Sequence, residues 1–436
     1  MENTGIPLLK PATRTGFHYY PDTLHYRESD LARWLPVLKA MDASWLVIQS
    51  DTRRAIPENF FNGLLQAGVE PIVQFGLSPG SPPNLTELTT LLEAYAHWGA
   101  QAVLLFDRPN ASASWSNGHW AQQDLVERFL DRFLPLSSAA LRLGLLPLFP
   151  ALEPGGSYWD TAFLRAALVS LERRKQTALL QRLVLSAWAH TGSRSLNWGS
   201  GGPERWPESR PYATPAGSED QRGFRIFDWY QAVAKSVFGQ ALPIILFGAG
   251  SPSSHLYAGE HRETALNIAR LMAGETVPDP MDMSASLDPV PAEVLACNFW
   301  RLAGDTDAWF PEDDQPLPAA SAIQEWRAAR VASGRKMAIP NTGEPGARPI
   351  AHYLLLPTYD WGVSEWHLSI IRPFVQKHAP TIGFSLAEAT LARQVTVVGN
   401  EQSFAEEDLN QLRAAGCSVE RISGDGTSIA TQLAER

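Results

Sequence analysis

Short apolar runs alternate with longer amphipathic segments along most of the chain. The longer segments repeat their apolar residues at helical spacing, as in residues 29–41, where Leu31, Trp34, Leu35 and Leu38 share one face. The short runs are nearly continuous in apolar character, which is typical of parallel strands buried on both faces. There are eight of them, at residues 16–20, 45–50, 71–75, 102–106, 142–146, 183–187, 243–247 and 295–300. This alternation predicts an α/β fold, a closed (β/α)8 TIM barrel.

A second pattern of the same kind follows a break. Residues 333–348 are rich in Gly, Pro and polar side chains and have no period, which is typical of a linker. From residue 351 onward, strand-like and helical segments alternate again, in the manner of a small α/β domain with a parallel sheet. We therefore predict a barrel at 1–335, a linker at 336–350 and a small α/β domain at 351–436.

The net charge of the chain limits the classes of binding partner that we expect. The 436 residues carry a net charge of −10, with a pI near 5.5, and no long block of Lys or Arg that could follow a phosphate backbone. Nucleic-acid binding is therefore not expected. Neutral or weakly charged partners fit this balance better.

The sequence has no motif that predicts a membrane span, a metal site or a cofactor site. No run approaches 18 apolar residues and the start lacks a leader pattern, so we expect no membrane span and, by default, a cytoplasmic chain, with the cell surface reached only through a partner. Cys297 and Cys417 are expected to be free buried thiols. Residues 260–263 lack the second His of a zinc-protease motif, and residues 248–251 lack a phosphate loop's further Gly or Lys. We expect no metal and no cofactor.

In a barrel of this kind, the active face is formed by the carboxyl ends of the strands and by the loops after them. The residues expected at those ends are His18, Asp22, Asp51, Gln74, Arg108, Glu153, His190, Leu246 and Trp300. The chain also has 15 tryptophans, several in apparent loops, where aromatic rings either cap a core or present flat faces to ligands. The long loop-like stretch 188–224, with Trp198 and Trp206, is expected to be a functional lid.

Two of these strand ends resemble a known family. Residues 102–115, AVLLFDRPNASASW, are similar to the fourth strand and catalytic turn of the clan A glycoside hydrolases, which read Asn-Glu-Pro there. Residues 243–250, PIILFGAG, look like the seventh strand of that clan, where a nucleophilic glutamate precedes an aromatic residue and a glycine. The resemblance places Arg108 at the acid/base position and Leu246 at the nucleophile position, with both side chains facing the barrel axis.

Two further stretches carry a resemblance. Trp300 is similar to the family's eighth-strand tryptophan, which stacks against the sugar; a ring that plugs the barrel mouth is the alternative. Residues 395–436 resemble one unit of the cell-wall-binding repeats. Gly426 and Thr427 replace the Arg-Tyr of that repeat, and only one copy is present.

The substitutions imply that the family's reaction is lost. Retaining glycosidases need two carboxyl groups, one as acid/base and one as nucleophile. Arginine cannot donate a proton at neutral pH, and leucine offers no nucleophile. We therefore lean toward a protein that is not an enzyme, a degenerate glycosidase that binds glycan or serves as a scaffold. The alternative alignment, shifted by a residue or two, would leave ordinary barrel strands at both places.

Two other functions stay open. An active hydrolase would use other carboxylates, namely Asp107, Glu153 or Glu260, and a structural or assembly protein would use its acidic helical exterior for protein contacts or self-association. For the first hypothesis, the expected partner is a glycan or a cell-wall polysaccharide. Its expected ligand-binding residues are Trp300, Trp115, Trp188, His190, His18 and Asn110.

Overall fold

The computed structural model describes residues 12–81, 83–115, 119–251, 257–279, 286–304, 307–311, 315–332, 350–357, 365–378, 380–390, 392–424 and 426–434. The chain divides into two compact units, residues 1–339 and 340–436. The predicted linker at 336–350 lies almost wholly outside the described residues. None of the helices in the described ranges combines the length and apolar character that a membrane crossing requires.

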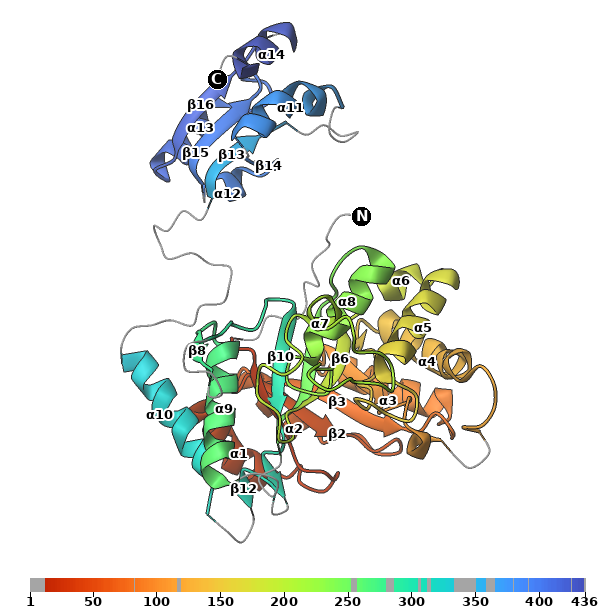
Figure 1. Ribbon diagram of the computed structural model, residues 1–436. Helices are drawn as coiled ribbons and strands as arrows, with labels where there is room; N and C mark the ends of the chain where they lie inside the picture. Colours follow the sequence, from red (N-terminus) through yellow and green to blue (C-terminus); the bar gives the residue numbers. More distant parts are fainter. Residues whose placement is uncertain are drawn as a thin grey trace. The chain divides into compact units, whose positions relative to one another are not determined.

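The first unit is built on eight parallel strands in the order β5-β4-β3-β2-β1-β10-β7-β6 (Figure 1). They are β1 (Thr15–His18), β2 (Trp45–Gln49), β3 (Glu70–Leu77), β4 (Ala102–Phe106), β5 (Leu146–Pro147), β6 (Leu185–His190), β7 (Ile244–Gly250) and β10 (Val294–Phe299). The edge strands β5 and β6 meet through a parallel bridge between Leu152 and Ala187 and through a hydrogen bond from Phe149 N to Val184 O (2.9 Å). The sheet therefore closes on itself, and the predicted (β/α)8 barrel is confirmed.

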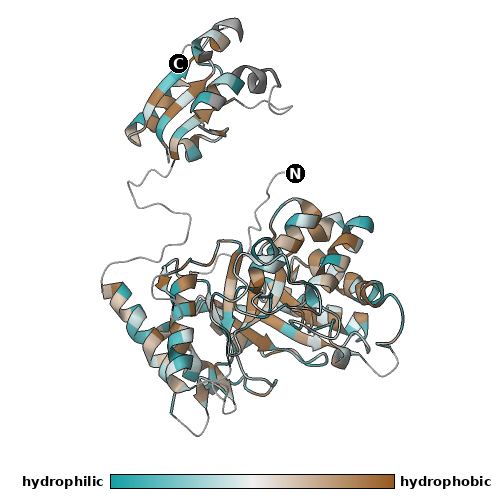
Figure 2. Ribbon diagram, viewed as in Figure 1, coloured by the Kyte–Doolittle hydropathy of each residue, from teal (hydrophilic) through white to brown (hydrophobic). Residues whose placement is uncertain are grey.

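Helices flank the central strands (Figure 1). They are α1 (Glu28–Ala40), α2 (Glu58–Gln66), α3 (Leu85–His97), α4 (Leu125–Arg142), α5 (Asp160–Arg173), α6 (Thr177–Leu180), α7 (Gly202–Arg205), α8 (Ile226–Phe238), α9 (Ala258–Met272) and α10 (Pro318–Ala332). Shorter elements are the 3-10 turn Ser112–Ser114 and the strand pairs β8 (Val277–Pro278) with β9 (Ser286–Leu287) and β11 (Ala303–Gly304) with β12 (Phe310–Pro311). Figure 2 shows apolar strands and two-sided helices, as the sequence pattern predicted.

Alternation along the strands produces two separate apolar layers. One cluster fills the barrel interior and contains Trp45, Val47, Leu104, Ile245 and Phe247. The residues next to these in sequence belong to a larger cluster that packs against the helices. Successive side chains of a strand point to opposite faces, so membership of a cluster tells which way a strand residue points.

The fifth strand is the one clear difference from the predicted elements. The sequence predicts a strand at 142–146, but α4 continues to Arg142 and β5 begins at Leu146. The helix ends at Leu143, and Gly144 follows with φ +85°, a left-handed conformation that glycine adopts without steric cost. The apolar residues 143–146 therefore include the end of the helix as well as the start of the strand.

The second unit is a four-stranded parallel sheet, β14-β13-β15-β16, with helices on both faces. Its elements are β13 (Ile350–Leu355), α11 (Glu365–His378), β14 (Thr381–Gly383), α12 (Leu386–Ala389), β15 (Ala392–Val398), α13 (Glu406–Ala414), β16 (Ser418–Ile422) and α14 (Gly426–Ala434). One apolar cluster joins the sheet to α12 and α13, and the other joins it to α11 and α14. The predicted small parallel-sheet fold is therefore confirmed.

Candidate functional site

A cavity of about 430 Å³ opens at the carboxyl ends of the barrel strands. We call it the mouth cavity. It is lined by His18, Pro21, Gln49, Gln74, Gly76, Leu77, Ser78, Asp107, Arg108, Ala113, Ser114, Trp188 and Trp300. These residues belong to the ends of β1, β2, β3, β4, β6 and β10 or follow them, which is the active face in barrels of this kind.

Arg108 stands at the centre of the charged side of the mouth cavity. Its backbone is left-handed, with φ +47°, and its N–H donates to the Ala151 carbonyl at 3.0 Å. Its guanidinium carbon lies 4.4 Å from the centre of the Trp188 ring. Its Nε lies 3.2 Å from Glu153 Oε2 and 3.6 Å from Asp107 Oδ2. The arginine therefore lies between two carboxylates while it covers an aromatic ring.

Asp107 is the carboxyl group of this side that lines the cavity. Its Oδ1 accepts a hydrogen bond from Trp188 Nε1 at 3.1 Å. Burial raises the pKa of Asp107, and the Arg108 charge and the Trp188 bond oppose that rise without cancelling it. Asp107 therefore holds its proton more readily than a solvated aspartate does.

His18 joins β1 to β7 across the barrel mouth. Its Nε2 accepts a hydrogen bond from the Gly248 N–H at 3.1 Å, which assigns the proton of the neutral ring to Nδ1. Burial lowers the pKa of His18 well below its ordinary value, and the charges of His190, Arg301 and Arg108 lower it further. The ring is therefore neutral at physiological pH, and it acts as an acceptor for the backbone of strand seven.

An aromatic wall faces this histidine. The His18 ring stacks on Trp188 at 5.4 Å between centres, and His190 stacks on Trp188 at 5.3 Å. Trp300 meets Trp188 edge-on at 5.8 Å, and the Arg301 guanidinium lies 4.3 Å from a Trp300 ring centre. Trp188 and Trp300 both line the cavity. Trp188 is only 2% exposed, because His18, His190 and Arg108 pack against its ring, so the ring surface open to a ligand is that of the half-buried Trp300.

The predicted orientation of Leu246 is wrong. Leu246 is fully buried and belongs to the helix-facing cluster, whereas its neighbour Phe247 belongs to the barrel interior. Gly248 comes next, with φ +56°, and a Cβ there would lie 2.6 Å from His190 and 2.7 Å from Trp188. The strand-end residue that faces the aromatic wall is therefore Gly248, two places beyond the residue chosen from the sequence. Neither Phe247 nor Gly248 supplies a carboxylate.

Three other expected site residues have structural roles. Asn110 is fully buried; its side chain donates to the carbonyls of Glu153 (2.9 Å) and Tyr158 (2.8 Å) and accepts from Glu153 N (2.8 Å), so it is not available to a ligand. Trp115 is 5% exposed, donates to Pro109 O and packs in the helix-facing core, so its expected stacking on a ligand is also wrong. Glu260 is exposed in the first turn of α9 and does not line the mouth cavity.

Gln49 is a lining residue that the sequence reasoning missed. Its side chain donates from Nε2 to Gln74 Oε1 at 3.0 Å, and the two amides lie at the ends of neighbouring strands. Trp45 and Val47 face the interior, so alternation along β2 places Gln49 on the same side. That period-two rule could have found it from the sequence.

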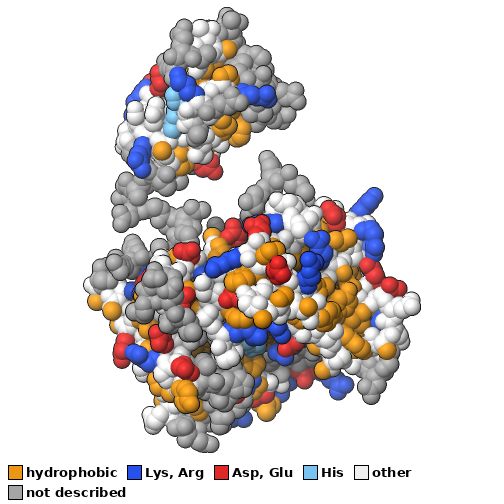
Figure 3. Space-filling model, in the orientation of Figure 1, with side chains coloured by type: hydrophobic (Ala, Val, Ile, Leu, Met, Phe, Trp, Pro, Cys, Tyr) orange, Lys and Arg blue, Asp and Glu red, His pale blue; other side chains and the backbone are white. Residues whose placement is uncertain are grey.

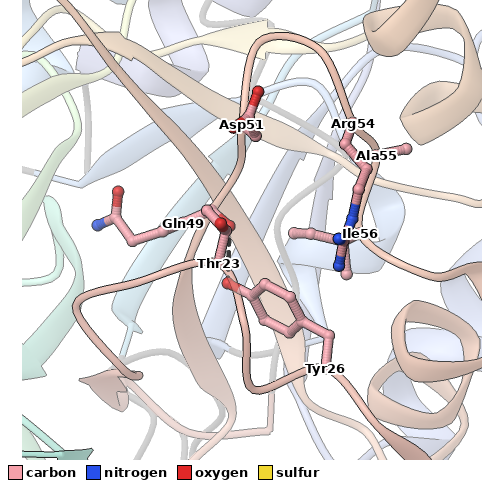
Figure 4. A pocket seen from close by; sticks show the side chains of 7 residues that line it. All are labelled: Thr23, Tyr26, Gln49, Asp51, Arg54, Ala55 and Ile56. Carbon is pink, nitrogen blue, oxygen red and sulfur yellow. Dashed lines mark hydrogen bonds between the residues drawn. The ribbon is translucent and has the colours of Figure 1, made fainter.

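Gln49 also borders a second, smaller cavity of about 50 Å³ beside the β1 and β2 loops. Figure 4 shows the Gln49 side chain directed away from Tyr26 and Arg54, while the Tyr26 hydroxyl donates to the Gln49 carbonyl at 2.7 Å. Asp51, expected at a strand end, borders this small cavity rather than the mouth cavity. A space of this size holds a few water molecules and no sugar ring.

The long segment after β6 is ordered in the described structure. Trp198 Nε1 donates to Asp220 Oδ1 at 3.1 Å, and Trp206 Nε1 donates to the Ser200 carbonyl at 3.0 Å. Asp220 also pairs with Arg222 at 2.5 Å. Both tryptophans therefore hold the segment together, and neither lines the mouth cavity.

Metal ligands do not gather anywhere in the described part of the chain, where no three His, Cys, Asp or Glu side chains are placed to share an ion. Cys297 and Cys417 are both free and buried, as expected. Acidic and basic side chains are interspersed on the face of the barrel unit that Figure 3 shows.

The sequence matches no protein-family model and none of the curated proteins searched. Among solved structures, a family 39 glycoside hydrolase from the gut symbiont Bacteroides cellulosilyticus has a TM-score of 0.49 and 11% identity over 72% of this chain, which spans 63% of that enzyme. An endo-beta-1,3-glucanase of family GH128 from Sorangium cellulosum has a TM-score of 0.41 and 14% identity, covering 71% of this chain and 97% of the other. The catalytic domain of a Streptomyces mannanase has a TM-score of 0.35 and 11% identity, covering 76% and 87%.

Similarity at this level says nothing about a site or an activity, and the fold assignment rests on the strand order and closure described above. The chain is a (β/α)8 barrel joined to a small parallel α/β unit.

Proposed function

We propose that the barrel binds a glycan in the mouth cavity and does not hydrolyse it. The observation that carries this proposal is the pairing of a half-buried aromatic ring, Trp300, with the amides of Gln49 and Gln74 in one cavity. Sugar rings pack their apolar faces on aromatic rings, while nearby amides and hydroxyls orient their hydroxyl groups. A volume of about 430 Å³ lies within the usual range of small-molecule sites.

The arrangement of the carboxyl groups argues against hydrolysis. A glycosidase places its two carboxyl groups on either side of the glycosidic bond, about 5 to 10 Å apart. Here Asp107 and Glu153 lie at the ends of neighbouring strands and both approach the Nε of Arg108. Both carboxyl groups therefore face one guanidinium, and strand seven contributes Phe247 and Gly248 instead of an acid.

One observation favours a second candidate function, an active hydrolase. Burial raises the pKa of Asp107, which is what a general acid needs at neutral pH. In that reading Asp107 would donate the proton and Glu153 would be the second carboxylate once a substrate had displaced Arg108.

For the second unit, residues 340–436, we propose only a supporting role in binding. Residues 395–436 resemble one unit of a cell-wall-binding repeat, so we propose that the second unit contributes to attachment to a polymer. Because a single copy is present and Gly426-Thr427 replaces the Arg-Tyr of the repeat, we expect its own affinity to be weak.

The test combines a glycan array with hydrolysis assays on the same purified full-length chain. Binding without release of new reducing ends is the expected result. Hydrolysis that survives repurification and is lost in Asp107→Asn, but not in the exposed control Glu260→Gln, would establish the hydrolase instead. If no glycan binds, the structural or assembly function takes the place of this proposal.

A further inference from the structure

Arg108 has hydrogen-bonding capacity that the protein does not use. An arginine carries five N–H donors in a planar fork. The Nε of Arg108 is buried and faces Asp107 and Glu153, and within the described ranges Nη1 and Nη2 have no protein acceptor. The side chain is nevertheless 34% exposed and lines the mouth cavity. Since Nε is buried, the exposed part of the guanidinium is its Nη edge.

This edge is held in place before any ligand arrives. The guanidinium carbon lies 4.4 Å from the centre of the Trp188 ring, Nε forms ion pairs with two carboxylates, and the left-handed backbone of the residue is fixed by the bond to Ala151. A donor pair that is already oriented loses little conformational entropy on binding. The Nη edge is therefore a preformed fork that points to the cavity.

A second guanidinium lies near the cavity. The Arg301 guanidinium carbon lies 4.3 Å from a Trp300 ring centre, and Trp300 meets Trp188, over which Arg108 lies. His18 between them is buried and neutral. The chain as a whole carries −10, which suits neutral partners, but the charges of Arg108 and Arg301 both act at His18, and two cations beside the cavity favour an anionic group there.

From this geometry we infer that the unused Nη edge of Arg108 binds a carboxylate, so that the ligands of the mouth cavity are glycans that contain uronic acid. The inference rests on the proposed function and names its ligand class. A carboxylate presents two coplanar oxygens, which match the two parallel donors of a guanidinium edge, and such charge-assisted pairs are about twice as strong as neutral hydrogen bonds. A neutral hydroxyl group can occupy only part of that edge.

The test uses pairs of ligands that differ only in the charged group. Oligosaccharides prepared from polygalacturonate, alginate and glucuronan are titrated calorimetrically into the full-length chain, each beside the same oligosaccharide after chemical reduction of its carboxyl groups. We expect at least one acidic member to bind about tenfold more tightly than its reduced partner. This preference should shrink as salt is added, because salt screens the ion pair.

Variants assign the preference to Arg108. Arg108→Gln should abolish the difference between the acidic and the reduced ligand, and Arg108→Lys, which keeps the charge and loses the planar fork, should retain part of it. Arg205→Gln is the matched control, because Arg205 also lies over a tryptophan, Trp206 at 5.3 Å, but does not line the cavity. The wild-type comparison needs no variant and stands even if Arg108→Gln fails to fold.

The outcomes separate the two proposals. Equal affinity for acidic and reduced ligands in the wild type, or an equal loss for both in Arg108→Gln, would overturn the uronic acid inference and leave neutral glycan binding standing. Absence of binding to acidic and neutral glycans alike would overturn the proposed function and this inference with it.

Discussion

The two sides of the barrel mouth differ in chemistry. The side built from β4 and β5 concentrates charge, with Arg108 between Asp107 and Glu153. The side built from β7 has no charged residue at its end; Phe247 fills the interior, and Gly248 leaves room for the rings of Trp188 and His190.

In the proposed function, the chemical difference between the two sides of the mouth allows glycan binding but not hydrolysis. Hydrolysis of a glycosidic bond needs acids on both sides of the bond, whereas binding needs only ring surface and oriented donors. Here both carboxylates of the charged side approach the same arginine, and the strand-seven side is filled by aromatic packing. The stability and the affinity of variants on each side can test this difference.

The largest effect is expected on the strand-seven side. Gly248→Ala adds a Cβ that would meet His190 at 2.6 Å and Trp188 at 2.7 Å, in a backbone with φ +56°. Overpacking costs about 1–3 kcal/mol and the left-handed backbone about 1–2 kcal/mol, so we expect the free energy of unfolding to fall by about 3 kcal/mol. Urea denaturation followed by tryptophan fluorescence measures it.

Gly239→Ala separates the two contributions. Gly239 also has a left-handed backbone, with φ +72°, but a Cβ there meets nothing within 4 Å, so only about 1 kcal/mol should be lost. Equal losses in the two variants would mean that the strand-seven side has room for a side chain. In that case the difference between the two sides would be smaller than the packing indicates.

The sequence predicted the fold well because the fold depends on periodicity. Period-two alternation and helical spacing are averaged over whole elements, so an error of one residue rarely changes the element. The closed (β/α)8 barrel and the second parallel sheet were both predicted in this way. The fifth strand was misplaced because apolar residues 143–146 span the end of a helix and the start of a strand, and only the turn at Gly144 separates them.

The site was predicted less well because it depends on single residues. Leu246 faces the helices, and the residue that faces the aromatic wall is Gly248, two places later. The irregular pairing at the end of β7 that causes this shift cannot be read from composition. Asn110 and Trp115 were chosen for residue type, but burial decided their roles. His18, Arg108, Trp188 and Trp300 do line the mouth cavity, and whether they bind a ligand stays a prediction.

Asp160, at the start of α5, should make the stability of the barrel depend on pH. It is fully buried and accepts hydrogen bonds from Gly155 N, Gln221 Nε2 and Tyr230 OH, and burial raises its pKa to about 6. The folded pKa lies above the unfolded one, so folding takes up a proton between about pH 4 and 6, and stability falls as pH rises through this window. A shift of about two units corresponds to about 3 kcal/mol as an upper limit, and we expect about 2 kcal/mol.

Asp160→Asn removes this titration. The difference in unfolding free energy between the wild type and the variant, measured by urea denaturation near pH 4 and near pH 7, should change by about 2 kcal/mol against the wild type. Asp131→Asn, at an exposed residue of α4, controls for the substitution itself. A difference that is the same at both pH values would show that ionised Asp160 is accommodated without cost.

The aromatic wall should contribute to affinity rather than to the fold. Replacing Trp300 by alanine removes a ring that lines the mouth cavity, and we expect binding of the glycan selected by the array to weaken by about 1–3 kcal/mol in calorimetric titration. The Trp300 carbonyl, which accepts from Trp309 Nε1 at 2.9 Å, remains in the variant. Trp98→Ala, in the helix layer against Phe61 and Tyr95, should lower stability and leave affinity unchanged. Equal affinity in wild type and Trp300→Ala would remove the stacking claim.

The smallest effect is expected from removal of the second unit. The buried clusters of residues 350–434 contain no residue of the barrel clusters in the described parts of the chain, and the two units are separately compact. A chain that ends near Ser333 should therefore keep the barrel's unfolding midpoint and its affinity for a soluble oligosaccharide, within about 0.5 kcal/mol. Denaturation and calorimetry beside the full-length chain check both quantities.

Binding to an insoluble polymer is the measurement that should decrease in the shortened chain, because the second unit is proposed to add a contact only with a polymer. Aggregation of the shortened chain would mean that the barrel needs the second unit to cover its own apolar surface, and the two would then have to be treated as one folding unit.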